Sequence, residues 1–198
     1  MTYWQQIPGI VGPAMARDFH RIGQQDTRAA IEDFVLQHSD HRIKFLDAGC
    51  NTGVTGYRLF QKGFRGQYHG VDSNGKALTF AAANMPAHPV ILLQEDVAKM
   101  SFPDRHFDIV LCKDVIEHCE GYLDIVKELC RVTWTWLILS MFIKPGPAPD
   151  QIRKMPEGFY MNRYNRDGLL AAITVNGFKW PTTLFEKGED EVLVFERQ

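Results

Sequence analysis

Residues 45–53 read Phe-Leu-Asp-Ala-Gly-Cys-Asn-Thr-Gly, a short apolar run that ends in a carboxylate and continues into a glycine-containing loop. Such a run is typical of a strand buried on both faces of a parallel sheet, and the glycines after it let a ligand approach the backbone. A carboxylate here, Asp47, would repel the pyrophosphate of a dinucleotide but attract an ammonium or sulfonium group. These residue types therefore favour S-adenosylmethionine over NAD.

A nicotinamide reductase built on the same kind of sheet is the alternative interpretation of this loop. Its fingerprint, G-x-G-x-x-G, aligns best with residues 51–56, where Asn51 replaces the first glycine. Asparagine adopts the left-handed conformation more readily than most residues, so the loop itself tolerates this change. The dinucleotide fingerprint is nevertheless incomplete, and together with Asp47 this disfavours the reductase.

Acidic side chains also close the next two predicted strands. Asp72 ends the run at 67–72, and Asp96 follows the run at 90–93. The carboxyl ends of parallel strands form the ligand-binding edge of an open α/β sheet, so Asp47, Asp72 and Asp96 should lie near one site. A solvated helix cap at Asp72 and a plain turn carboxylate at Asp96 are the simpler interpretations. The order and spacing of the three carboxylates favour the shared site.

These strands belong to a chain in which apolar, strand-like runs alternate with helix-period segments, the pattern of a doubly wound α/β sheet. Five parallel strands are expected, at 43–47, 67–72, 90–93, 107–112 and 134–142. Helices are expected at 27–37, at 53–61, at 75–83, around the apolar stripe 122–129, and from 165 to 176.

Two further strands are expected at 179–185 and 191–195, and the short segment between them suits an antiparallel hairpin. Pro181 lacks the N–H that a strand in the interior of a sheet donates. The sixth strand should therefore lie at an edge, with the seventh between it and the other five.

With these elements placed, the chain from about residue 43 to its C-terminus resembles a class I S-adenosylmethionine-dependent methyltransferase of the type 11 group. Residues 45–53, 70–73 and 94–97 look like the first three motifs of this family, and residues 107–118 look like its fourth strand and the helix that follows. The resemblance implies a Rossmann-like α/β fold. Its seven-stranded, mostly parallel sheet has the order 3-2-1-4-5-7-6, with strand 7 antiparallel and helices on both faces.

The resemblance also implies roles for the residues at the strand ends. Asp72 would accept both ribose hydroxyls, for which two carboxylate oxygens are well suited. Asp96 would take the adenine amine, while the backbone amide of Val97 would meet a ring nitrogen. The full set that the resemblance assigns to the cofactor is Asp47, Gly49, Cys50, Asn51, Gly53, Asp72, Ser73, Asp96, Val97 and Lys113.

Methyl transfer in this family is an in-line displacement that needs mainly correct positioning in a dry pocket. A weak nucleophile such as a hydroxyl would be helped by a base, and His118, after the fourth strand, is the candidate. The alternative is that His118 only packs against or caps its helix. Asp114, Glu117 and His118 have helical spacing and could share one face. Some methyltransferases bind a magnesium-type ion with a similar set, but many relatives carry it without a metal, so no metal is expected.

Two segments outside the core are expected to select the acceptor. Residues 1–25 are rich in aromatic side chains, among them Trp4, and are predicted to fold over the pocket as a lid. Residues 144–163, called the flap below, begin with a proline-rich stretch and end in an aromatic and basic run. The candidate acceptor contacts are Trp4, His118, Tyr160 and Arg163.

The flap and the residues just after it are basic. Positions 144–166 hold five basic and two acidic side chains. An acceptor that carries a carboxylate or a phosphate would suit this charge. A solvated loop whose charges touch nothing is the alternative that the sequence leaves open.

Composition limits the other classes of protein. The 198 residues, 45% of them hydrophobic, suit one domain over 1–198, and a net charge of -2 does not favour nucleic acid as a partner. The N-terminus lacks the features of a signal peptide and no apolar run could span a bilayer, so a cytoplasmic location without membrane contact is expected. The four cysteines lack C-x-x-C spacing and are expected to be reduced thiols rather than disulfides or zinc ligands.

The favoured hypothesis is an enzyme that methylates an O, N or C centre of a small molecule, because the additions to the core are short and the charge is near neutral. A methyltransferase of a protein or RNA acceptor, with the basic flap as contact, is the first alternative. A subunit that binds the cofactor without turnover is the second.

Overall fold

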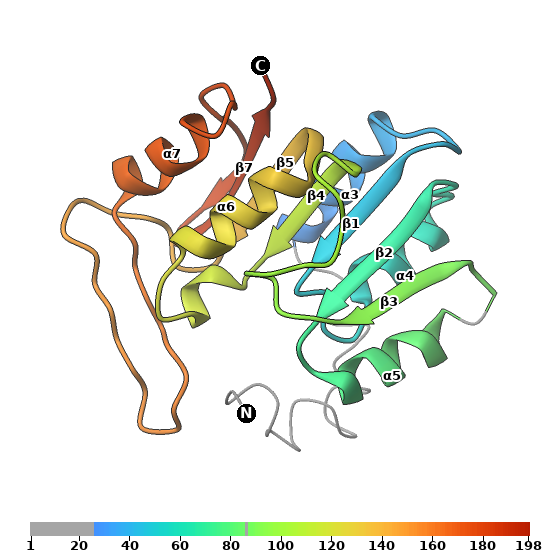
Figure 1. The fold of residues 1–198 in the computed structure, drawn as a ribbon, viewed down its shortest axis with the longest axis horizontal. Helices are drawn as coiled ribbons and strands as arrows, with labels where there is room; N and C mark the ends of the chain where they lie inside the picture. Colours follow the sequence, from blue (N-terminus) through green and yellow to red (C-terminus); the bar gives the residue numbers. More distant parts are fainter. Residues whose placement is uncertain (1–25, 86) are drawn as a thin grey trace.

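A computed structural model describes residues 26–85 and 87–198 of the chain (Figure 1). The predicted lid, with Trp4, lies outside these residues. At the centre is a seven-stranded sheet of order β3-β2-β1-β4-β5-β7-β6. Its strands are β1 (Lys44–Ala48), β2 (Gln67–Asp72), β3 (Val90–Gln94), β4 (Phe107–Lys113), β5 (Thr133–Met141), β6 (Thr182–Lys187) and β7 (Asp190–Glu196).

Strands β1 to β5 pair in parallel, whereas β7 is antiparallel to both β5 and β6. The predicted strand order, with β7 between β5 and the edge strand β6, is therefore confirmed. Strand β6 begins at Thr182, later than expected, directly after Pro181. Proline has no N–H to donate, so the edge strand begins only after it.

Helices cover both faces of the sheet, as predicted. They are α3 (Asp26–Gln37), α4 (Val54–Gln61), α5 (Gly75–Asn84), α6 (Leu123–Val132) and α7 (Arg166–Thr174), with the 3-10 turn η1 (Ile116–His118) before α6. Buried side chains of α3, α4 and α5 form one apolar cluster, and those of α6 and α7 form the other. In Figure 1, α6 and α7 accordingly lie in front of the sheet, with α3 behind it.

Strand β1 shows why the central strands of this sheet appear in the sequence as continuous apolar runs. Phe45 packs in the cluster with α3 and α4, and its neighbour Leu46 packs in the cluster with α6 and α7. Both side chains are fully buried because successive residues of a strand point to opposite faces. A strand in this position needs apolar residues throughout, and it ends where polar ones begin.

The final helix ends slightly earlier than expected. Helix α7 stops at Thr174, and the chain leaves it through a turn in which Gly177 has φ 89. This left-handed glycine matches the predicted terminus. Across residues 26–85 and 87–198, no helix combines the length and the apolar character needed to cross a membrane.

Candidate active site

The loop between β1 and α4 turns sharply at three left-handed residues. Gly49, Asn51 and Gly53 have φ values of 83, 49 and 74, so Asn51 adopts the conformation predicted for it. A Cβ at Gly49 would lie 2.4 Å from Cγ2 of Val115, which no side chain tolerates. The amide of Gly49 donates to the carbonyl of Val71 at 2.7 Å. The loop therefore folds across the end of β2 with a bare backbone at Gly49.

Asp72, at the end of β2, is held by this loop and by the start of α5. Its Oδ2 accepts the Asn51 amide at 2.9 Å, and its Oδ1 accepts the Asn74 amide at 2.8 Å. Burial raises the pKa of Asp72, whereas the two backbone hydrogen bonds lower it. Each carboxylate oxygen can still accept a second hydrogen bond. The side chain is thus a fixed acceptor for paired hydroxyl donors.

Asp47 lies beneath the loop rather than at its mouth. Its side chain is only 3% exposed, and Oδ2 accepts the Tyr68 hydroxyl at 2.8 Å. Thr55 also hydrogen-bonds to it, and the buried Arg28 guanidinium bonds to Thr55. Burial raises the pKa of Asp47 to about 6, while Tyr68 and Arg28 favour its charged form. The charge of Asp47 is therefore balanced from inside the protein.

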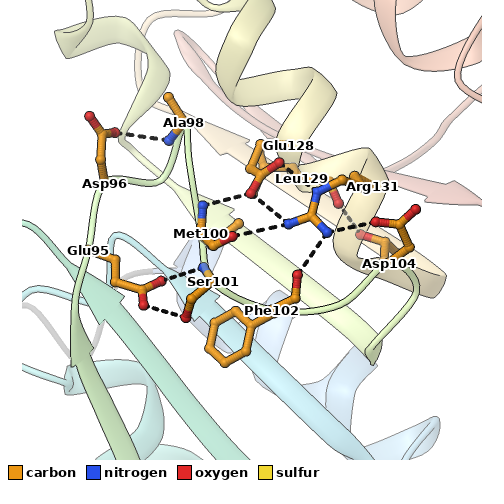
Figure 2. Close-up of polar contacts among 11 residues, drawn as sticks. Glu95, Asp96, Ala98, Met100, Ser101, Phe102, Asp104, Glu128, Leu129 and Arg131 are labelled. Atoms are coloured by element: carbon orange, nitrogen blue, oxygen red, sulfur yellow. Dashed lines mark hydrogen bonds and ion pairs between the residues drawn. The ribbon is translucent and has the colours of Figure 1, made fainter.

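The segment after β3, which carries Asp96, is clamped by α6 (Figure 2). Asp96 Oδ1 accepts the amide of Ala98 at 2.9 Å, and the Met100 amide donates to Glu128 Oε1 at 2.6 Å. The Arg131 guanidinium reaches Glu128, the carbonyls of Met100 and Phe102, and the Asp104 carboxylate (Figure 2). Its carboxylate partners raise the pKa of Arg131. This clamp fixes the turn that presents Asp96.

The Asp-x-x-Glu-His set after β4 does not share one helical face. Asp114 has φ 56 and forms an ion pair with Lys113, and only the short turn η1 follows before α6 begins at Leu123. Glu117 points inward, is 1% exposed, and accepts the Phe142 amide at 2.8 Å. Burial and the nearby Asp114 raise the pKa of Glu117 to about 8. Within the described residues, no three His, Cys, Asp or Glu side chains are arranged to hold a metal ion.

His118 points from η1 towards the flap. Its Nδ1 lies 2.9 Å from the carbonyl oxygen of Tyr160. A carbonyl only accepts, so Nδ1 carries the proton and Nε2 is the basic nitrogen of the neutral ring. Burial lowers the pKa of His118, which keeps the ring neutral near pH 7. The ring packs against Phe142 and Phe159, with centroids 5.2 and 6.1 Å away.

These elements surround a cavity of about 830 Å³ at the carboxyl ends of the first four strands. The predicted cofactor residues that line it are Gly49, Asn51, Asp72, Ser73, Asp96 and Val97. The predicted acceptor residues His118 and Tyr160 line it as well, together with Phe159 from the flap. One cavity therefore joins the predicted cofactor residues to the predicted base.

The remaining predicted cofactor residues lie behind this lining. Asp47 is buried below the loop, and Cys50 packs beneath it beside Gly70. Gly53 lies against Ala81 and Met85 of α5 and its neighbouring turn. The Lys113 side chain is 7% exposed, and its ammonium pairs with Asp114. These four residues therefore support the loop and β4 and do not line the cavity.

Arg163 also lies away from the cavity. Its guanidinium donates to the Lys144 carbonyl at 2.8 Å and pairs with Glu189 at 2.6 Å, on the outer side of the flap. The flap is a long hairpin-like excursion, the orange loop of Figure 1, with paired positions at Gln151 and Arg163 and at Lys154 and Tyr160. Because the two arms of the flap are paired in this way, successive side chains of each arm point to opposite sides of the flap.

Sequence reasoning missed the residue that fastens the flap. Asn162 is fully buried, donates to the Cys119 carbonyl at 2.5 Å and to the Tyr164 hydroxyl at 2.8 Å, and accepts the Arg153 amide at 2.9 Å. Its own amide donates to the Glu117 carbonyl at 2.9 Å. No local pattern marks this asparagine, because the partners that tie it to the rest of the fold, Glu117 and Cys119, lie more than forty positions away, in η1 and directly after it.

Comparison with known proteins supports the same class. Residues 46–134 match the family described as a methyltransferase domain. The ubiquinone biosynthesis O-methyltransferase of Rickettsia typhi is 27% identical over 114 residues, which cover 57% of this chain and 46% of that protein. The chain thus spans about half the length of this curated relative.

Solved structures share the fold across nearly the whole chain. The magnesium protoporphyrin IX methyltransferase of Synechocystis PCC 6803, crystallised with S-adenosylhomocysteine, matches with a TM-score of 0.68 and 20% identity over 90% of this chain and 84% of that one. A protein of Pyrococcus horikoshii OT3 matches with a TM-score of 0.70 and 20% identity over 99% of this chain and 98% of that one.

The sheet order, the loop after β1 and these likenesses define a Rossmann-like methyltransferase fold of class I. Together with the domain match over residues 46–134, these likenesses support a class I S-adenosylmethionine-dependent methyltransferase. The predicted family and the predicted cofactor class are both confirmed.

Proposed function

We propose that this chain transfers the methyl group of S-adenosylmethionine to a small molecule bound in the cavity under the flap. The observation that carries the proposal is the gathering of Asp72, Asp96 and His118 around one space of about 830 Å³. That volume is of the order expected for a pocket that holds small ligands, about 300 to 1,000 Å³. The names of the Rickettsia typhi and Synechocystis methyltransferases also refer to small molecules.

The residues present fit the cofactor. Asp72 has its two oxygens fixed by backbone amides and keeps acceptor capacity for the ribose hydroxyls. Gly49 lines the cavity with bare backbone, which allows close approach of the methionine part of the cofactor. Asp96 and Val97, held by the clamp of Arg131, are placed for the adenine. When bound, the cofactor supplies an electrophilic methyl group on a sulfonium.

His118 is the proposed base. Its Nδ1 proton is committed to the Tyr160 carbonyl, so Nε2 is the atom that accepts a proton from the acceptor as its O, N or C centre becomes methylated. Burial keeps this imidazole neutral, which is the form that the role requires. Phe142 and Phe159 fix the ring plane. The aromatic walls keep water away from the reacting centre.

Asp47 is proposed to act through the loop. It ties Tyr68 of β2 and Thr55 of α4 to the end of β1, and Arg28 offsets its charge. This arrangement holds the loop in its left-handed path. The electrostatic attraction between Asp47 and a sulfonium therefore acts over a distance, without contact.

The transfer reaction itself tests the function. Purified protein is incubated with methyl-labelled S-adenosylmethionine and with either a small-metabolite extract or the protein and RNA fractions of a lysate. Label is expected in small molecules and is expected to be lost in the His118→Ala variant. Label only in protein or RNA would favour a macromolecular acceptor, and no transfer at all would favour a subunit that binds the cofactor without turnover.

A further inference from the structure

Three of the five basic side chains that suggested an anionic acceptor are paired outside the cavity lining. Arg163 pairs with Glu189 at 2.6 Å, and Arg166 pairs with Glu191 at 2.6 Å. Lys144 pairs with Glu186. All three carboxylates belong to the β6–β7 hairpin and its turn, on the outer side of the flap. The positive charge of these three side chains therefore fastens the flap and the start of α7 to the sheet and is not offered to a ligand.

Aromatic rings form the wall on the flap side of the cavity. Phe159 and Tyr160 line it from the flap, and His118 lines it from η1. Lys154 is the cation of the cavity lining, and its ammonium lies 5.5 Å from the centre of the Tyr160 ring. A cation over an aromatic face is stabilised by the ring. Flat surfaces of this kind suit a planar acceptor.

Carboxylates dominate the rest of the lining. Glu120 and Asp124 lie at the rim, between η1 and the first turn of α6, and neither has an ion-pair partner among the described residues. The other carboxylates of the lining are Asp72, Glu95, Asp96 and Asp114. Apart from Lys154, no Lys or Arg lines this cavity in the described part of the chain. An incoming anion would meet net repulsion at the rim.

We propose that the acceptor is a planar aromatic molecule that is neutral or positively charged where it faces the rim, such as a phenol or heteroaromatic ring that carries an amine. This inference rests on the proposed function, because it names the substrate class of the same cavity. It reverses the expectation of an anionic acceptor that the composition of the flap suggested. The flap supplies the flat surface, while η1 and α6 supply the charge selection.

Three phenols that differ only in the para substituent test the proposal. Tyramine is a cation, p-cresol is neutral, and 4-hydroxyphenylacetate is an anion at pH 7. Their dissociation constants are measured by calorimetry on protein saturated with S-adenosylhomocysteine. Tyramine and p-cresol are expected to bind at least tenfold more tightly than 4-hydroxyphenylacetate. Equal or tighter binding of the anion, or no binding of any of the three, would overturn the proposal.

A charge reversal at the rim separates selection by charge from general affinity for phenols. Glu120→Lys is expected to weaken tyramine and strengthen 4-hydroxyphenylacetate by about threefold each at low salt. Glu157→Lys makes the same charge change on the flap, outside the lining, and is the matched control that should change neither. If both variants behave alike, the rim does not select the ligand. Failure of S-adenosylhomocysteine to bind would instead refute the proposed function.

Discussion

Replacing Asn162 by alanine should release the flap and change the state of His118. Three side-chain hydrogen bonds disappear, to the Cys119 carbonyl, the Tyr164 hydroxyl and the Arg153 amide. The side chain is fully buried, so water does not replace its bonds in the folded protein. At about 1 kcal/mol for each bond, the free energy of unfolding should fall by about 2 to 3 kcal/mol. That is a large part of the stability of an ordinary domain.

The change at His118 distinguishes a released flap from a merely weakened fold. The Tyr160 carbonyl selects the Nδ1-protonated form of His118, and the flap that Asn162 anchors buries the ring. In Asn162→Ala the pKa of His118 should rise towards its ordinary value, and the share of the Nε2-protonated form should grow. Nitrogen-15 NMR of the histidine ring reads both quantities directly, and urea unfolding reads the stability.

Asn165→Ala is the matched control. The Asn165 side chain caps α7 by accepting the Gly168 amide at 2.6 Å, and it makes no contact with His118 among the described contacts. Its loss should cost about 1 kcal/mol and leave the histidine signals unchanged. A smaller loss of stability in Asn162→Ala than in this control, or an unchanged ring tautomer of His118, would show that Asn162 does not anchor the flap.

Substitutions at Glu117, His118 and Arg163 test the site further. The proton on Glu117 contributes stability that is complete below the ordinary pKa of a glutamate and is lost as the pH rises through about 8. In Glu117→Gln the amide oxygen can still accept the Phe142 amide, but the side chain no longer titrates. The urea midpoint of this variant should therefore depend less on pH between pH 5 and 8. His118→Ala should lower kcat by about a hundredfold or more while the affinity for S-adenosylhomocysteine stays the same. The wild-type rate should fall as acid protonates the ring, at a pH below the ordinary histidine pKa. An unchanged kcat in the variant would leave His118 only a structural role. Arg163→Gln loses the exposed pair with Glu189 and the hydrogen bond to the Lys144 carbonyl, so it should cost about 1 to 2 kcal/mol and leave the acceptor KM unchanged. A raised KM would place Arg163 in the site.

The sheet was predictable because its strands are buried on both faces. Phe45 and Leu46 pack into opposite clusters, and such strands require runs of apolar residues that stand out in the sequence. Polar residues end these runs at the ligand-binding edge, which is why Asp72 and Asp96 could be assigned to the cavity. The left-handed conformation of Asn51 was predictable because asparagine adopts it more readily than most residues.

The site was less predictable where the backbone departs from a regular element. Helical spacing suggested that Asp114, Glu117 and His118 share one face, but the left-handed Asp114 and the tight turn η1 send Glu117 inward. Asp47 was expected to meet the ligand, yet Tyr68 and Arg28 enclose it from elements that are distant in the sequence. Contacts of this kind depend on the packing of elements, which local patterns do not encode.

The charge of the flap shows the same limit. Five basic residues near the flap suggested an anionic ligand, but the structure places carboxylates of the β6–β7 hairpin against three of them. Those carboxylates lie more than twenty positions further along the chain. Composition gives the number of charges in a segment, whereas their function depends on which partners the fold brings to them.

Calorimetric titration with S-adenosylhomocysteine tests whether Asp72 holds the cofactor. The wild-type protein should bind it, and Asp72→Ala should bind it about a hundredfold more weakly, because two hydrogen bonds to a charged acceptor are lost at about 1.5 kcal/mol each. NADH should not compete. Tighter binding of NADH, or full affinity for S-adenosylhomocysteine in Asp72→Ala, would contradict the cofactor site described above.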